Sequence, residues 1–268
     1  MRRRTARSWV SMAAVALAAI SAPPLVREAR AGDDAPETIM KRALERDGLG
    51  LEGGHATLTM TIAQEDGTTE ARTFEVWSKR KDGLLRTVIR FSAPAKIAGM
   101  AFLMLQRKGL ADEQYIYLPA YKKSRRITAK ERTGSFASSD FTYADLERRE
   151  LKDATYKKLP DEDIGKDKCN VLDAVPAAGT SSAYQHVTTW LRKGDDVPLR
   201  TQFFGEGGKL EKTMFTKKLK TIDGKVVVTL SRLERAGSKR WTELSVDAIT
   251  FSLDAPDAMF TEAALSGG

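Results

Sequence analysis

Most of the chain alternates apolar and polar residues with a period of two. In residues 58–62, Leu58, Met60 and Ile62 fall on one face and two threonines on the other, as in a half-buried antiparallel strand. The pattern recurs to the C-terminus and predicts about a dozen strands, which favours a mainly β fold, an unclosed barrel or strongly curved sheet, over alternating β-α units. The predicted strands are residues 58–62, 72–78, 84–91, 99–106, 114–118, 121–127, 154–159, 168–175, 186–192, 199–204, 210–219, 225–234 and 241–251.

Turn and helix signals punctuate this pattern. Asp66-Gly67, Asp82-Gly83 and Asp223-Gly224 each separate two predicted strands and supply the positive φ that tight hairpins require. Before the first strand the period changes: residues 36–49 place apolar side chains at helical spacing and end near Asp47-Gly48, which predicts one helix. We expect that helix to lie against an apolar surface.

The N-terminus has the pattern of a secretion signal. An arginine-rich start precedes an apolar run over residues 9–22, and Ala29-Arg30-Ala31 offers a small-residue cleavage site before Gly32. A membrane anchor needs about 20 consecutive apolar residues, and this run ends sooner. We therefore expect residues 1–31 to be cleaved as a signal peptide, leaving a single soluble periplasmic domain over residues 32–268.

The charge argues against a nucleic-acid partner. The formal net charge is +8, but much of this excess belongs to the arginines of the predicted signal peptide. The remaining domain is only weakly basic, so no nucleic acid is implied. Cys169 is the single cysteine, which excludes an internal disulfide and predicts a buried strand residue.

Catalytic and metal-binding patterns are weak. His55 and His186 have no second histidine or cysteine at ligand spacing, so no metal site is predicted. Ser135 and Ser139 lie close to Asp140 in sequence, but no G-x-S-x-G motif surrounds them. We expect no catalytic residue, no cofactor and no enzymatic activity.

The middle of the chain carries the most distinctive motifs. It contains FSAPAKIAGMAFLMLQR, YIYLPAYKKSRRI and GSFASSDFTYADL within residues 91–146. In these motifs the chain resembles the outer-membrane lipoprotein-sorting proteins, a family related to the periplasmic lipoprotein carrier LolA. The similarity continues more weakly along the chain as far as Phe251 and the closing Pro256–Phe260. The matching residues of the three motifs are Phe91, Pro94, Gly99, Phe102, Leu103, Tyr117, Leu118, Pro119, Arg125, Arg126, Gly134, Ser135, Phe136, Ser139, Asp140, Phe141, Tyr143 and Asp145.

The resemblance implies an unclosed antiparallel β-barrel whose concave face, covered by short helices, holds acyl chains. Strand alternation supplies candidates for such a cavity, with methionine suited to irregular contents. The alternative is ordinary core, because a stripe of apolar residues at strand period is usually packed against other protein atoms. The candidate cavity residues are Leu58, Met60, Ile62, Phe74, Val76, Leu85, Ile89, Phe91, Phe102 and Met104.

Two further groups are candidates for binding. Lys123, Arg125 and Arg126 belong to the densest basic run and are candidates for contact with lipid headgroups or an acidic partner; a charged edge strand explains them equally well. Phe136, Phe141 and Tyr143 are candidates for the mouth or lid of the cavity. Thr142 and Asp145 have capping-box spacing, so this segment is also expected to begin a helical turn.

Two function classes remain open. The first is a soluble carrier that takes lipoprotein acyl chains or phospholipid from an inner-membrane transporter to an outer-membrane acceptor. The second is a periplasmic sensor or accessory module that binds the same ligand, or docks on a transporter, without moving cargo. Fold-level analogy does not choose between them. In either case we expect a monomer.

Overall fold

The computed structural model describes residues 34–46, 53–178, 180 and 182–267. These residues form one antiparallel sheet of 13 strands, which confirms the predicted mainly β fold. The strands are β1 (Gly53–Ala63), β2 (Thr69–Lys81), β3 (Leu84–Ala93), β4 (Ala101–Leu105), β5 (Glu113–Leu118), β6 (Lys123–Arg126), β7 (Ala154–Ile164), β8 (Asp167–Pro176), β9 (His186–Arg192), β10 (Pro198–Phe204), β11 (Leu210–Ile222), β12 (Lys225–Arg235) and β13 (Trp241–Phe251).

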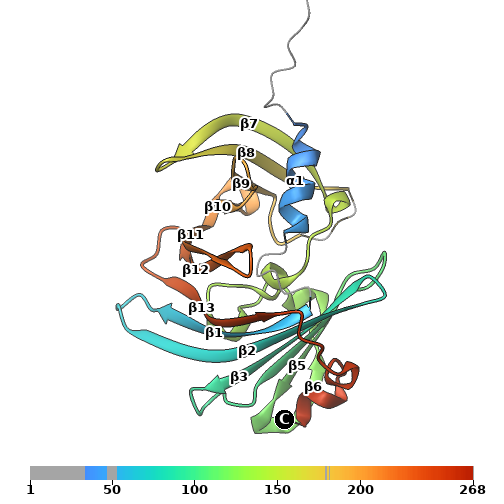
Figure 1. Ribbon diagram of the computed structural model, residues 1–268. Helices are drawn as coiled ribbons and strands as arrows, with labels where there is room; N and C mark the ends of the chain where they lie inside the picture. The colour runs from blue at the N-terminus through green and yellow to red at the C-terminus, as the bar shows by residue number, and fades with distance from the viewer. Residues whose placement is uncertain (1–33, 47–52, 179, 181, 268) are drawn as a thin grey trace, which may run out of the picture. The chain divides into compact units, whose positions relative to one another are not determined.

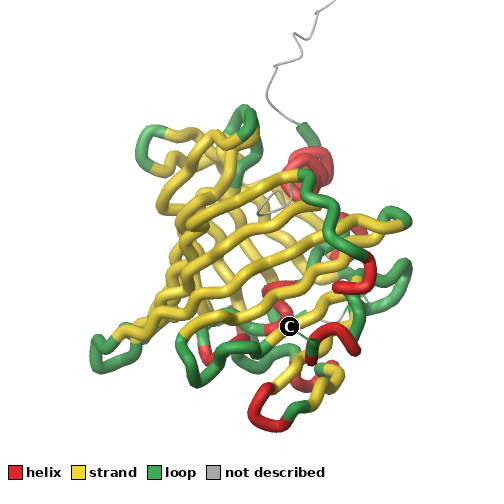
Figure 2. The backbone as a smooth tube through the Cα atoms, turned by 60° about the horizontal axis from the view of Figure 1, so that its bottom comes forward, coloured by secondary structure: helices red, strands yellow, loops and turns green. Residues whose placement is uncertain are grey.

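The sheet is built from consecutive hairpins joined at one place by a long-range pair. Its order is β6-β5-β4-β3-β2-β1-β13-β12-β11-β10-β9-β8-β7, so only β1 and β13 are neighbours that are distant in sequence. Their register runs from Gly54 opposite Phe251 to Ala63 opposite Trp241. Figures 1 and 2 show the strands side by side from one edge to the other. In the described chain β6 and β7 are edges that do not pair, so the barrel is unclosed.

Short helices complete the fold. The single α-helix among the described residues, α1 (Pro36–Glu45), places Ile39 and Met40 against Leu172 of β8 and Leu191 of β9. Residues 47–49, the end of the predicted helix, lie outside the described residues. The 3-10 turns are η1 (Pro119–Tyr121), η2 (Ala129–Glu131), η3 (Phe136–Ser138), η4 (Tyr143–Leu146), η5 (Leu151–Asp153), η6 (Glu206–Gly208), η7 (Asp257–Met259) and η8 (Ala263–Ser266).

Several strands, such as β1 and β2, are longer than predicted, and two predicted strands extend beyond the strands that form. The predicted strand 121–127 is shorter, because Pro119 begins a 3-10 turn and Lys122 adopts a left-handed conformation with φ 50° before β6 starts. The predicted strand 99–106 narrows to β4, since Gly99 has φ +79° and belongs to the preceding turn. None of the described helices is long and apolar enough to cross a membrane.

The first half of the sheet is packed on both faces. We call the face of the sheet that carries Leu58 and Phe74 the inner face; Phe102 of β4 belongs to its hydrophobic cluster. On the outer face, Leu103 packs beneath Phe260 and Leu265 of the C-terminal segment, residues 252–267. Both faces of β4 are therefore packed, the inner face within the cluster of Leu58 and Phe74 and the outer face against the C-terminal segment.

Ion pairs fix the C-terminal segment to the outer face. Lys79 and Lys81 of β2 lie 2.8 Å from Asp254 and 2.5 Å from Asp257 respectively. The hydrogen bond from Lys81, and then that from Lys79, lowers the pKa of Asp257 to about 2. Ser124 of β6 donates to Glu262 at 2.7 Å. The segment is thus attached at both β2 and the β6 edge.

Candidate ligand-binding cavity

A cavity of about 540 Å³ lies on the inner face of the sheet. Both halves of the sheet contribute to its wall, as do α1 and the turns η3 to η5. Apolar side chains dominate the lining, while charged side chains occur mainly in residues 145–153. The apolar lining includes Met40, Leu44, Leu58, Met60, Phe74, Val76, Leu85, Ile89, Met104, Phe136, Phe141, Leu146, Val187, Leu191, Phe203, Met214, Leu233 and Leu244.

The sequence-predicted cavity residues divide between this wall and a packed cluster. Ile62, Phe91 and Phe102 are not part of the wall; each is at most 2% exposed and belongs to the inner-face cluster. The predicted residues that do line the cavity are Leu58, Met60, Phe74, Val76, Leu85, Ile89 and Met104. The alternation along the strands places all ten side chains on the same face. Some of them face the cavity, whereas Ile62, Phe91 and Phe102 are packed against other protein atoms.

An aromatic side chain separates the two regions. Phe136 is 1% exposed, and its ring lies 4.6 Å from that of Phe102 and 5.9 Å from that of Phe91. Tyr143 lies 5.8 Å from Phe102 and packs on the same cluster. Among the predicted mouth residues, Phe136 and Phe141 line the cavity and Tyr143 does not. One end of the inner face is therefore filled by protein, and the cavity begins where this filling ends.

The filling comes from residues 134–146, which we call the inner segment. Local hydrogen bonds shape it: Ser135 Oγ donates to the Ser139 carbonyl, and Ser139 Oγ donates to the Phe136 carbonyl at 2.7 Å. Thr142 and Asp145 form the predicted capping box at the start of η4. These hydrogen bonds pair polar groups within the inner segment, but they do not attach the segment to the sheet.

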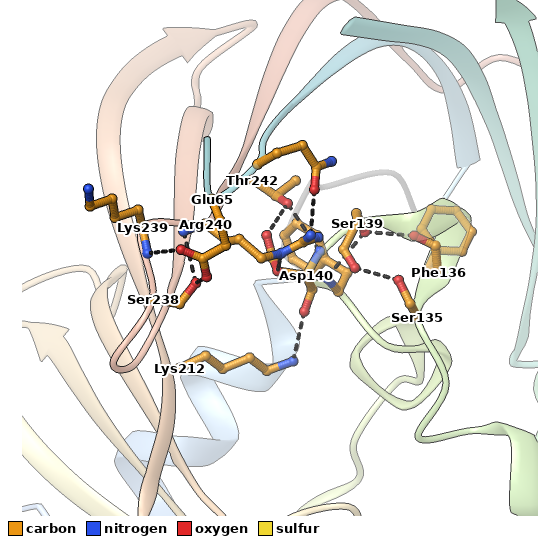
Figure 3. Close-up of polar contacts among 12 residues, drawn as sticks. Glu65, Ser135, Phe136, Ser139, Asp140, Lys212, Ser238, Lys239, Arg240 and Thr242 are labelled. Carbon is orange, nitrogen blue, oxygen red and sulfur yellow. Dashed lines mark hydrogen bonds and ion pairs between the residues drawn. The ribbon is translucent and has the colours of Figure 1, made fainter. Parts of the chain in front are cut away.

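Asp140 joins the inner segment to β13. Thr242, which is fully buried, donates to Asp140 Oδ2 at 2.8 Å and accepts from the Asp140 amide at 3.1 Å. Arg240 Nε donates to Asp140 Oδ1 at 3.2 Å, and its Nη1 also donates to Gln64 at 2.5 Å. Figure 3 shows these side chains converging on Asp140 from the sheet. The carboxylate is thereby buried with its oxygens hydrogen-bonded.

Asp145 joins the same segment to β11. Its Oδ2 lies 2.5 Å from Lys212 Nζ, and the two side chains are only 6% and 7% exposed. Tyr184 donates to Asp145 Oδ1 at 2.7 Å. Burial, and then the Asp145 charge, raises the pKa of Tyr184, so its hydroxyl keeps the proton it donates. Lys212 also donates to the Asp140 carbonyl at 3.3 Å, which links the two anchors.

Sequence reasoning missed Lys212 and most of the second half of the cavity. Lys212 lies in a lysine-rich strand whose other lysines are exposed, so nothing in the composition of the strand distinguishes it from them. The alternation of side chains along the strand was the available signal. Lys212 is two residues from Met214, so both lie on the same face of the strand, and Met214 lines the cavity. The contributions of α1, Phe203 and Leu233 had no comparable local signal.

The basic run lies at the β6 edge of the sheet. Arg125 pairs with Glu131 at 2.7 Å, and Arg126 lies 3.6 Å from Glu113. Lys123 is exposed. None of the three lines the cavity, and the charged edge strand accounts for their position. Across the described residues, no group of three or more His, Cys, Asp or Glu side chains is arranged to hold a metal ion.

The fold and the cavity together define this protein as an unclosed antiparallel barrel with an apolar hollow. Several solved structures are similar to it in fold. An outer membrane lipoprotein-sorting protein domain from Vibrio parahaemolyticus is 26% identical with a TM-score of 0.79, covering 86% of this chain and 98% of that one. A DUF1329 family protein from Desulfovibrio piger is also 26% identical, with a TM-score of 0.80 over 86% of this chain and 98% of its own.

A third structure extends the relationship. A LolA superfamily protein from Nitrosomonas europaea is 20% identical with a TM-score of 0.69, covering 85% of this chain and 98% of that one, which shows the shared fold. Residues 83–267 match a family model described as "-like: Uncharacterized protein". No curated protein sequence matches the chain. The chain belongs to the family that this model describes, and its structural neighbours are a lipoprotein-sorting domain, a DUF1329 protein and a LolA superfamily protein, which confirms the predicted resemblance.

Phe102 and Met104 provide a test of the boundary between packed core and cavity. Phe102→Ala removes a ring packed against Phe136 and Phe91, so we expect a loss of about 3–5 kcal/mol in the free energy of unfolding. Met104→Ala, at a partly exposed cavity position on the same strand, should lose much less. Denaturant unfolding measures both. Equal losses would contradict this boundary.

Lys212 provides a test of the inner-segment anchor. Lys212→Ala leaves Asp145 buried without its cation, so we expect a loss of about 3–5 kcal/mol in the free energy of unfolding. Adding Asp145→Asn should restore part of it, because an amide buries no unpaired charge. Lys218→Ala, at an exposed position of the same strand, is the matched control and should change stability by less than about 0.5 kcal/mol. A Lys212 variant as stable as the control would show that the pair does not anchor the segment.

Proposed function

We propose that this protein is a soluble periplasmic carrier that binds acyl chains of lipoproteins or lipids in the inner-face cavity and delivers them toward the outer membrane. The observation that carries the proposal is the cavity itself: about 540 Å³ lined mainly by apolar side chains from both halves of the sheet. The 26% identical lipoprotein-sorting domain supports the same role. Binding and transfer require neither a catalytic residue nor a cofactor.

The proposal accounts for the cavity through the free energy of burying hydrocarbon. Each methylene removed from water contributes about 0.8 kcal/mol, so an acyl chain that crosses an aqueous compartment needs a protein surface that covers it. Leu58, Met60 and Phe74 offer such a surface from the first half of the sheet, and Phe203 and Met214 from the second. An inner-membrane transporter would donate the cargo, and an outer-membrane acceptor would receive it from the monomeric carrier.

Acyl binding and transfer test the proposal together. We expect the purified protein to bind a dansyl-labelled fatty acid saturably at micromolar concentration, with one dominant site. We also expect it to accelerate transfer of labelled lipid from donor to acceptor vesicles. Binding without acceleration would favour the sensor role. Absence of saturable binding would overturn the cavity as a lipid site.

A filled-cavity variant gives the matched control. Val187 lines the cavity from β9 and is partly exposed, so Val187→Trp places a larger side chain in the hollow. We expect weaker probe binding with little change in the unfolding midpoint. Unchanged affinity in this variant would place the probe elsewhere on the protein.

The location of the protein is tested by its mature mass. Ala29-Arg30-Ala31 precedes Gly32, so we expect signal peptidase to release a chain that begins at Gly32. Intact-mass measurement of protein from the soluble periplasmic fraction checks this. Retention of residues 1–31, or recovery only with membranes, would overturn the proposed location.

A further inference from the structure

A small polar pocket adjoins the apolar cavity. It has a volume of about 100 Å³ and lies between the η2 region and residues 147–153. Glu147, Arg148, Arg149 and Asp153 line both this pocket and the cavity. The two hollows therefore meet along one stretch of chain, which gives the combined site an apolar part and a polar end.

Positive charge predominates in the polar pocket. Arg132, Arg148 and Arg149 are its cationic lining residues, against the carboxylates of Glu147 and Asp153. Arg132 pairs with Glu147 at 2.6 Å, so these two opposite charges neutralise each other within the wall. Arg149 is exposed. Among the other charged lining residues, Arg148 and Arg149 exceed the carboxylate of Asp153 by one formal positive charge, which suits an anionic group.

Arg132 is held in the pocket wall by protein contacts that leave one of its donors unpartnered. Its Nη1 faces Glu147 and its Nη2 donates to the Asp112 carbonyl at 2.5 Å. Its Nε is buried and has no hydrogen-bond partner among the described residues. Unpartnered buried donors are uncommon in native proteins, but this nitrogen is covered by protein atoms, so Arg132 forms the wall and contact with a ligand falls to Arg148 and Arg149.

From this arrangement we propose that the polar pocket binds the phosphate of an amphiphile whose acyl chain occupies the apolar cavity. Arginine presents a planar set of donors that matches phosphate oxygens, and Arg148 and Arg149 border both hollows. The ligand class is a phospholipid. The acylated cysteine of a lipoprotein has no phosphate for these arginines. The inference rests on the proposed function and narrows its cargo.

Competition against a dansyl-labelled fatty acid tests the inference with matched ligands. The mature protein is titrated with 1-lauroyl-lysophosphatidylglycerol, with 1-lauroylglycerol and with glycerol phosphate. The first two share one chain and differ in the phosphate. Because hydrogen bonds to charged groups contribute about 1.5–3 kcal/mol, we expect the lysophospholipid to compete about 10- to 100-fold better than the monoacylglycerol. Glycerol phosphate alone should displace nothing, which separates a lipid headgroup from a free phosphate site.

Two arginine variants locate the preference. Arg149→Gln, alone and combined with Arg148→Gln, should remove most of the lysophospholipid advantage; because both arginines also line the cavity, the readout is the ratio of the lysophospholipid affinity to the monoacylglycerol affinity. Arg126→Gln, which replaces an exposed arginine at the β6 edge, is the matched control and should keep the full advantage. Circular dichroism checks that each variant folds.

The outcomes separate this inference from the proposed function. Equal competition by the two acyl ligands in the unaltered protein would overturn the phosphate site while the acyl cavity stands. Loss of the advantage in Arg126→Gln but not in the Arg149 variants would move the headgroup site to the basic edge and also overturn it. Failure of the dansyl probe to bind would overturn the proposed function, and the phosphate site with it.

Discussion

The fold depends on how an unclosed sheet covers its apolar inner face. Without a closing pair between β6 and β7, the inner side chains of β1 to β4 have no opposing strand to pack against them at this end. The inner segment supplies the cover through Phe136, and two buried carboxylates hold it in place. Asp140 is bound by Thr242 and Arg240, and Asp145 by Lys212. These contacts come from β11, β13 and Arg240 just before β13, all distant in sequence from the segment that they hold.

Buried ion pairs carry a desolvation cost, so the Asp145–Lys212 pair is weak evidence for stability by itself. The pair instead fixes the position of the inner segment on the sheet. Charge pairs and hydrogen bonds have directional geometry, whereas apolar contacts between Phe136 and its neighbours would tolerate sliding. Fixing the segment through Asp140 and Asp145 therefore determines where the packed cluster ends. The extent of the cavity follows from that boundary.

Much of the fold is predictable from local pattern. Period-two alternation located every strand, and the Asp-Gly pairs marked hairpins that the structure contains, including the turn at Asp223, where φ is 49°. The order of hairpins follows, since consecutive antiparallel strands pair readily. The pairing of β1 with β13 is different. No local signal specifies that residues 54–63 meet residues 241–251, and that contact decides that the two halves form one sheet.

The candidate site was less predictable for a related reason. Alternation assigns a side chain to a face, but it does not say what lies above that face. Phe102 and Met104 occupy the same face of one strand, yet Phe136 covers the first and the cavity adjoins the second. Lys212 shows the converse. No sequence pattern marks it as buried, and Asp145 of the inner segment supplies the partner charge that a buried lysine needs.

Partial filling of the inner face has a consequence for how the proposed acyl ligand would leave the cavity. Burying a chain of 16 methylenes completely would contribute about 13 kcal/mol at about 0.8 kcal/mol each, which corresponds to very slow escape into water. A bilayer offers the chain the same burial, so transfer from cavity to membrane is close to neutral for the hydrocarbon. The free-energy difference that directs transfer must then come from the polar end of the ligand. Under the proposed binding mode that end would lie beside Arg148 and Arg149, where the cavity wall changes from apolar to charged. Retention is therefore expected to depend on charge, and so on ionic strength, more than on chain length once the cavity is full.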